Sequence, residues 1–140
     1  MVRNKDHPTA MKKTLQRLKD MTTFLIPLNV ILGVSKEPNH WILFYVDITA
    51  KEALLIDSSE SSLASYMPYV ETLVGILSKI TGEVINAGSV TYLEDRPIQT
   101  NDYDCGLIVC MHLYWYSRFR SVEAFKKKDY WNQEKAKYYR

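Results

Sequence analysis

The chain has 140 residues, of which 46% are apolar and 24% charged, and its formal net charge is +2. This length predicts a single domain that can bury a core without disulfides or a structural metal. Its two cysteines are too few for a disulfide framework or a zinc site. No apolar stretch reaches the length of a transmembrane helix, and the first 20 residues lack the apolar run of a signal peptide.

Basic residues concentrate at the two ends of the chain. The first 20 residues hold six basic and two acidic side chains, and the last 20 hold six and three, so the middle hundred have a net charge of −5. An acidic middle argues against nucleic acid and favours a partner with a basic face, although solvated surfaces without a partner remain an alternative. We expect an intracellular monomer without membrane contact, in the nucleus or cytoplasm, or in a host cell if the source is a pathogen.

Apolar periodicity and turn signals divide the chain into alternating helices and strands. In chain order they are a helix over 9–21, strands over 24–30, 41–48 and 53–57, a helix over 63–80, an interrupted strand over 84–93 and a helix over 105–119. Pro27 predicts an edge position or a bulge for the first strand. The segment 41–48 is apolar on both faces, as in a central strand. The helix over 105–119 is apolar enough to be buried all round, and 120–140 is a basic, aromatic tail with one or two short helices.

The most informative segment is Gln99-Thr100-Asn101-Asp102-Tyr103-Asp104-Cys105-Gly106, which leads directly into the apolar helix. A thiol attacks as the thiolate, and helix N-termini favour negative charge. An amide side chain six residues upstream can donate a hydrogen bond to a developing oxyanion. The segment therefore predicts a cysteine nucleophile at Cys105, with Gln99 as the amide donor.

A cysteine nucleophile needs a base, and the base needs an orienting acid. His7 lies in a charged stretch, and His112 lies seven residues past Cys105 on the same predicted helix, roughly 10 Å along its axis, which is too far for a hydrogen bond. His40 stands at a loop-to-strand junction, where catalytic groups are commonly displayed. Folding 41–47 back onto 52–58 as a hairpin brings Asp57 next to His40 and leaves Asp47 at the opposite, turn end.

Each of these residues also has an ordinary structural explanation. Lone cysteines are mostly small buried hydrophobes, and an aspartate at a strand end often only caps the following turn. The combination of His40, Asp57, Gln99 and Cys105, each at a suitable junction, is much less expected by chance.

Taken together, these residues resemble the SUMO/sentrin-specific proteases, the ubiquitin-like-protein proteases related to the adenovirus protease. The resemblance covers about residues 24–119 and rests on His40-Trp41 opening a strand, Ile56-Asp57-Ser58 closing the next, and Gln99 before Asp104-Cys105-Gly106. An Ile-Pro-Xaa-Asn segment before the His-Trp pair adds to it. The resemblance implies a longer N-terminal region than the 39 residues that precede His40 here, so we expect this part to be missing or shortened, either in a fragment or in a minimal member with an open channel.

The resemblance implies an α+β, papain-like fold, with a nucleophile helix packed on a small mixed or antiparallel sheet and residues 1–140 forming one catalytic domain. It implies a thiol protease or isopeptidase that cleaves after the C-terminal Gly-Gly of SUMO, ubiquitin or a related modifier, without metal or cofactor. Cys105 would attack, His40 would act as base and then acid, Asp57 would orient it, and Gln99 would stabilise the oxyanion. Trp41, Asp104 and Gly106 would contact the substrate, with Trp41 covering a channel that admits only glycines.

Two other functions remain open at this point. An effector-type acetyltransferase uses the same His-acid-Cys order, although its acid is usually glutamate and this chain has Asp57. A non-catalytic relative could bind a modifier without cleaving it, but nothing structural requires all four residues of the proposed site together.

Overall fold

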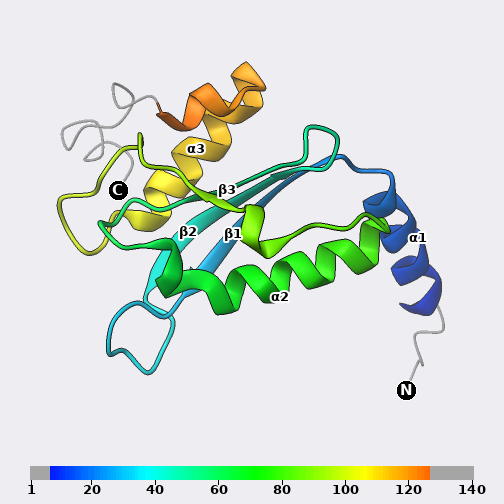
Figure 1. Cartoon of the computed structure of the whole chain (residues 1–140), viewed down its shortest axis with the longest axis horizontal. Coiled ribbons are helices and arrows are strands. Elements are labelled where there is room, and N and C mark those ends of the chain that lie inside the picture. Colours follow the sequence, from blue (N-terminus) through cyan, green and yellow to red (C-terminus); the bar gives the residue numbers. More distant parts are fainter. Residues whose placement is uncertain (1–6, 127–140) are drawn as a thin grey trace.

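The computed structural model describes residues 7–126, in which a four-stranded sheet lies between two long helices (Figure 1). Its elements are α1 (His7–Lys19), β1 (Thr23–Val30), β2 (His40–Asp47), β3 (Glu52–Ile56), α2 (Leu63–Thr81), β4 (Thr91–Tyr92) and α3 (Cys105–Phe119), with 3₁₀ turns at Ala87–Ser89 and Val122–Lys126. All of the longer elements agree with the predicted ones to within two residues at each end. The fold is α+β, as expected.

The sheet is mixed, with strand order β1-β2-β3-β4. The first three strands are antiparallel neighbours, and β4 runs parallel to β3. β1 lies at an edge of the sheet, which suits Pro27 because proline has no backbone N–H to donate to a neighbouring strand. β2 is the central strand of the antiparallel part, as its apolar sequence predicts.

The two faces of the sheet bury two separate cores, because successive residues of a strand point to opposite faces. From β2, Ile42, Phe44 and Val46 join the core under α2, which buries Tyr66, Val70, Val74 and Leu77. Leu43 and Tyr45 point the other way and pack against Val109 and Tyr116 of α3 and against Phe125. β2 is therefore buried on both faces, and α2 and α3 lie on opposite sides of the sheet, as Figure 1 shows.

The structure corrects two of the predicted elements. The strand over 84–93 is reduced to Thr91–Tyr92, because Asn86 Oδ1 accepts a hydrogen bond from the Gly88 N–H at 2.8 Å and begins a 3₁₀ turn instead. The helix α3 is also not buried all round. Its sheet-facing side is buried, whereas Cys110, Tyr114 and Phe119 are exposed. Its high apolar content comes partly from aromatic residues on the side away from the sheet.

Each long helix ends in a residue with left-handed backbone geometry. Gly82 ends α2 with φ of 73°, a conformation that glycine adopts without steric cost, and its N–H reaches the Ser78 carbonyl. Beyond α3, the tail predicted to hold one or two short helices contains a 3₁₀ turn at Val122–Lys126, and the rest of the tail lies outside the described residues. Within residues 7–126, no helix has the length and apolarity needed to cross a bilayer.

Candidate active site

The hairpin of β2 and β3 brings a histidine and an aspartate together at one end of the sheet. The last paired residues of the ladder are Leu43 and Ile56, so the chain segments just beyond them lie side by side. There, His40 Nε2 lies 2.6 Å from Asp57 Oδ1. Both side chains are buried, with 3% of His40 and none of Asp57 exposed. Asp47 lies at the other end, where its carboxylate accepts a hydrogen bond from the Ala50 N–H.

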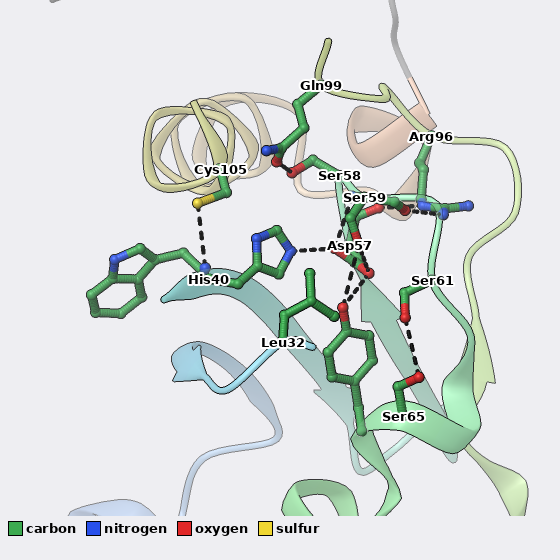
Figure 2. A network of polar contacts seen from close by, with 12 residues as sticks. Leu32, His40, Asp57, Ser58, Ser59, Ser61, Ser65, Arg96, Gln99 and Cys105 are labelled. Carbon is green, nitrogen blue, oxygen red and sulfur yellow. Dashed lines mark hydrogen bonds and ion pairs between the residues drawn. The ribbon is translucent and has the colours of Figure 1, made fainter. Parts of the chain in front are cut away.

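Four further hydrogen bonds hold the Asp57 carboxylate, and Figure 2 shows the side chains of Ser59 and Asp57 side by side. Oδ1 accepts the Ser59 N–H at 2.9 Å, and Oδ2 accepts the hydroxyls of Ser59 at 2.6 Å, Tyr66 at 2.6 Å and Tyr92 at 2.9 Å. Burial by itself raises the pKa of Asp57, but the hydrogen bonds from His40, Ser59 and Tyr66 outweigh it and bring the pKa to about 2. Asp57 is therefore ionised at neutral pH and suited to stabilise an imidazolium.

The two tyrosines remain protonated donors for the same reason. Burial, and then the hydrogen bond to Asp57, raise the pKa of Tyr66 to about 12. Burial and the Asp57 charge raise the pKa of Tyr92 above its ordinary value. Their hydroxyl protons thus stay in place over the physiological pH range.

Cys105 is the first residue of α3 and faces the histidine from the side opposite to Asp57. Figure 2 shows the imidazole of His40 between Cys105 and Asp57. Because Nε2 is paired with Asp57, Nδ1 is the ring nitrogen left for the thiol. The Cys105 sulfur accepts a hydrogen bond from the Trp41 backbone N–H at 3.4 Å, and only 5% of the residue is exposed. A helix N-terminus and a backbone donor both favour a negatively charged sulfur.

Gln99 lies beside the pair, between Cys105 and Ser58 in Figure 2. Its backbone N–H donates to the Ser58 carbonyl at 2.8 Å, which fixes the loop against the end of β3. His40 and Gln99 both line a cavity of about 490 Å³. A second cavity, of about 370 Å³, lies at the turn end of the hairpin and is lined by none of the predicted site residues.

The three residues predicted to contact the substrate occupy different surroundings. Trp41 is 40% exposed, and its indole lies over Gly106, where an added Cβ would be 3.3 Å from Trp41 Cδ1. Asp104 is buried, and its carboxylate accepts a hydrogen bond from Asn101 Nδ2 at 2.7 Å. Trp41 and Gly106 thus form one surface beside Cys105, whereas Asp104 braces the loop before the helix.

Sequence reasoning missed several residues that support the site. Tyr66 lies on the buried side of α2, and a buried tyrosine usually has a partner for its hydroxyl, which was the available signal. Arg96 is buried and donates to the backbone carbonyls of Asp57, Ser59 and Leu93 and to the Tyr92 hydroxyl. An arginine in a predicted loop gives no sign of this role.

The remaining histidines stay apart from the site. His112 is buried on α3 against Phe125, as its place on the apolar helix predicts. The side chain of His7 lies outside the described residues. Among residues 7–126, no group of three or more histidine, cysteine, aspartate or glutamate side chains is arranged to hold a metal ion.

The chain is similar to proteases of ubiquitin-like modifiers. It is 26% identical to a putative ubiquitin-like-specific protease 1B of Arabidopsis thaliana in an alignment of 126 residues that covers 86% of this chain and 34% of that protein. It is 25% identical to the C-terminal Ulp1 protease domain solved in complex with Smt3, the yeast ortholog of SUMO, with a TM-score of 0.59 over 77% of this chain and 47% of that one.

The fold is also similar to that of the SUMO protease Ulp1 with its catalytic cysteine oxidised to a sulfenic acid. There the TM-score is 0.60 at 23% identity, over 84% of this chain and 53% of the other. The chain therefore spans about a third of the curated relative and about half of these solved domains. The model of the Ulp1 protease family, C-terminal catalytic domain, matches residues 2–139, and the chain belongs to this family.

Proposed function

We propose that the chain is a cysteine peptidase that cleaves after the C-terminal Gly-Gly of SUMO, ubiquitin or a related modifier. The observation that carries the proposal is the buried His40–Asp57 pair, 2.6 Å apart, facing Cys105 at the start of α3. Membership of the Ulp1 family supports the same reaction class, and a relative solved with a SUMO ortholog supports the class of partner.

In the first step, the Cys105 sulfur attacks the carbonyl carbon of the last glycine of the modifier. The thiol proton passes to His40 Nδ1, a carbon–sulfur bond forms, and the carbonyl electron pair moves onto oxygen. Asp57, ionised and bonded to Nε2, stabilises the resulting imidazolium and holds the ring in one tautomer. The Gln99 amide and the Cys105 N–H, which has no intrahelical acceptor at the first helical position, would bind the oxyanion.

In the second step, the tetrahedral intermediate collapses and the carbon–nitrogen bond breaks. His40 returns its proton to the leaving amine, which is a lysine side chain in a conjugate or a backbone amine in a precursor. A water molecule then attacks the thioester with His40 as base, and the modifier leaves with a free carboxylate while Cys105 regains its proton.

The surface formed by Trp41 and Gly106 favours a narrow substrate tail. The indole lies within contact distance of the helix start, and it is 40% exposed and free to cover a bound chain. A tail of two glycines carries no side chain that would collide with an indole. We assign Trp41 and Gly106 to substrate contact, and Asp104 to the support of this surface through its bond to Asn101.

A panel of modifiers carrying a C-terminal electrophile tests the proposal. We expect covalent labelling of the unmodified chain by at least one member, and no labelling of Cys105→Ala or His40→Ala. Cys110→Ala is the matched control, because Cys110 is an exposed cysteine on the same helix. Labelling that persists in Cys105→Ala would refute the assignment of the nucleophile. A stable acetyl-thioester formed from acetyl-coenzyme A would instead favour an acyltransferase.

A further inference from the structure

Ser58 makes two contacts with Gln99, one through its hydroxyl and one through its backbone carbonyl. It follows Asp57 directly and is buried, with 4% of the residue exposed. Its hydroxyl oxygen lies 2.5 Å from Gln99 Oε1, and its carbonyl oxygen accepts the Gln99 N–H at 2.8 Å. The hydroxyl therefore contacts the side chain that the proposed function assigns to the oxyanion.

A third contact determines which way round the Gln99 amide lies. Gln99 Nε2 is 2.6 Å from the Asn101 carbonyl oxygen. A carbonyl oxygen can only accept, so the reverse orientation would place two acceptors against each other. The amide nitrogen must face Asn101, the amide oxygen must face Ser58, and the Ser58 hydroxyl must be the donor. One amide proton binds Asn101, and the second is left for another acceptor.

We propose that Ser58 is a positioning residue that holds the Gln99 amide with its NH₂ group toward the reacting carbonyl. The inference rests on the proposed function, because it requires an oxyanion at this place. Asp57 and Ser58 are adjacent, so one short segment at the end of β3 orients both the imidazole through Asp57 and the oxyanion donor through Ser58. A shift of this segment would disturb the base and the donor together.

Removing the Ser58 hydroxyl should slow turnover without weakening substrate binding. Loss of an entire oxyanion donor lowers kcat by about 10²–10³-fold. In Ser58→Ala the donor is still present but is held only by Asn101, so we expect a smaller loss, about tenfold in kcat with little change in KM. Ser58→Thr keeps the hydroxyl and should recover most of the rate, whereas Ser58→Val, of similar shape, should not.

The test uses the full chain and a SUMO or ubiquitin substrate with a fluorogenic C-terminal amide. Ser65→Ala is the matched control, because Ser65 is exposed on α2 and its hydroxyl contacts only neighbouring serines among the described hydrogen bonds. Alkylation of Cys105 by iodoacetamide is measured in parallel. This reaction forms no oxyanion, so it should proceed at the same rate in Ser58→Ala and in the unmodified chain.

A double-mutant cycle with Gln99→Ala gives the sharpest outcome. If Ser58 acts through Gln99, then Ser58→Ala should lower kcat no further in a chain that already lacks the amide. Independent, multiplicative losses would overturn the proposal, as would an unchanged kcat in Ser58→Ala or an equal fall in the alkylation rate. The proposal would also be overturned if circular dichroism showed that Ser58→Thr folds while Ser58→Ala and Ser58→Val do not. The Ser58 hydroxyl would then be needed for folding and not for the position of the amide. No cleavage by the unmodified chain would refute the proposed function itself.

Discussion

Replacing Tyr66 by phenylalanine should destabilise the fold through Asp57. The change removes one hydroxyl, which donates to Asp57 Oδ2 at 2.6 Å, and keeps the aromatic ring in the α2 core. A hydrogen bond to a buried charged group contributes about 1.5–3 kcal/mol. We therefore expect the free energy of unfolding at pH 7 to fall by about 2 kcal/mol, and the midpoint of thermal unfolding by about 8 °C.

The pH dependence of this loss identifies its cause. The pKa of Asp57 lies at about 2 in the fold against an ordinary 3.8, a difference that corresponds to about 2 kcal/mol of stability. Because the pKa is lowered by folding, this stability is complete above about pH 4 and is lost as the pH falls toward 2. The difference in the free energy of unfolding between the unmodified chain and Tyr66→Phe should therefore shrink below pH 4. A protonated Asp57 carries no charge, so the hydrogen bond from Tyr66 stabilises it less.

Urea unfolding followed by circular dichroism measures the gap at each pH. Tyr69→Phe is the matched control on the same helix, because its hydroxyl is paired, among the described hydrogen bonds, with an exposed backbone N–H from Ile31. This substitution should lower the free energy of unfolding by less than about 1 kcal/mol, and the loss should not change over the pH range in which Asp57 titrates. Equal losses in the two variants, or a Tyr66→Phe gap that stays constant from pH 7 to pH 3, would refute the role of Tyr66 as a support for ionised Asp57.

Three further changes probe other parts of the structure. Asp57→Asn protein that circular dichroism shows to be folded should have a kcat about 10²–10⁴-fold lower on a modifier substrate, because the charge opposite the imidazolium is gone. Activity within a factor of three would contradict the proposed triad. Burial lowers the pKa of His112 to about 4, so the unfolded chain binds a proton at this residue before the folded chain does. The free energy of unfolding should therefore fall by about 3 kcal/mol as the pH drops from 6.5 to 4. In urea titrations His112→Leu should flatten this pH dependence, and an unchanged slope would point to other groups. Gly106→Ala should displace the Trp41 indole and alter the tryptophan fluorescence. The rate of modifier cleavage should then fall more than the rate of Cys105 alkylation. Equal changes in both rates would show that the surface formed by Trp41 and Gly106 does not contact the substrate.

The local sequence predicted an element correctly where a clear change in residue type marked the end of its apolar pattern. The helix over 105–119 has its predicted bounds because a polar loop changes directly into an apolar run at Cys105. The hairpin could be predicted from two strands and a short turn, and with it the pairing of His40 and Asp57. The same reasoning placed Asp47 at the opposite end, where it caps the turn.

Contacts that depend on several distant elements could not be predicted in this way. Tyr66 and Tyr92 reach Asp57 from α2 and β4, and Arg96 reaches its backbone from a loop. None of these contacts has a spacing rule in sequence. The exposed side of α3 was missed for a related reason. The apolar content of a helix does not show which of its faces are covered by neighbouring elements.

Cleavage of a modifier precursor is the most direct test of the central claim. A SUMO or ubiquitin precursor that extends beyond Gly-Gly is incubated with the chain, and the products are identified by intact mass. We predict release of the extension after the second glycine by the unmodified chain and by Cys110→Ala, and none by Cys105→Ala. Cleavage at another bond, or equal cleavage by Cys105→Ala, would contradict the account.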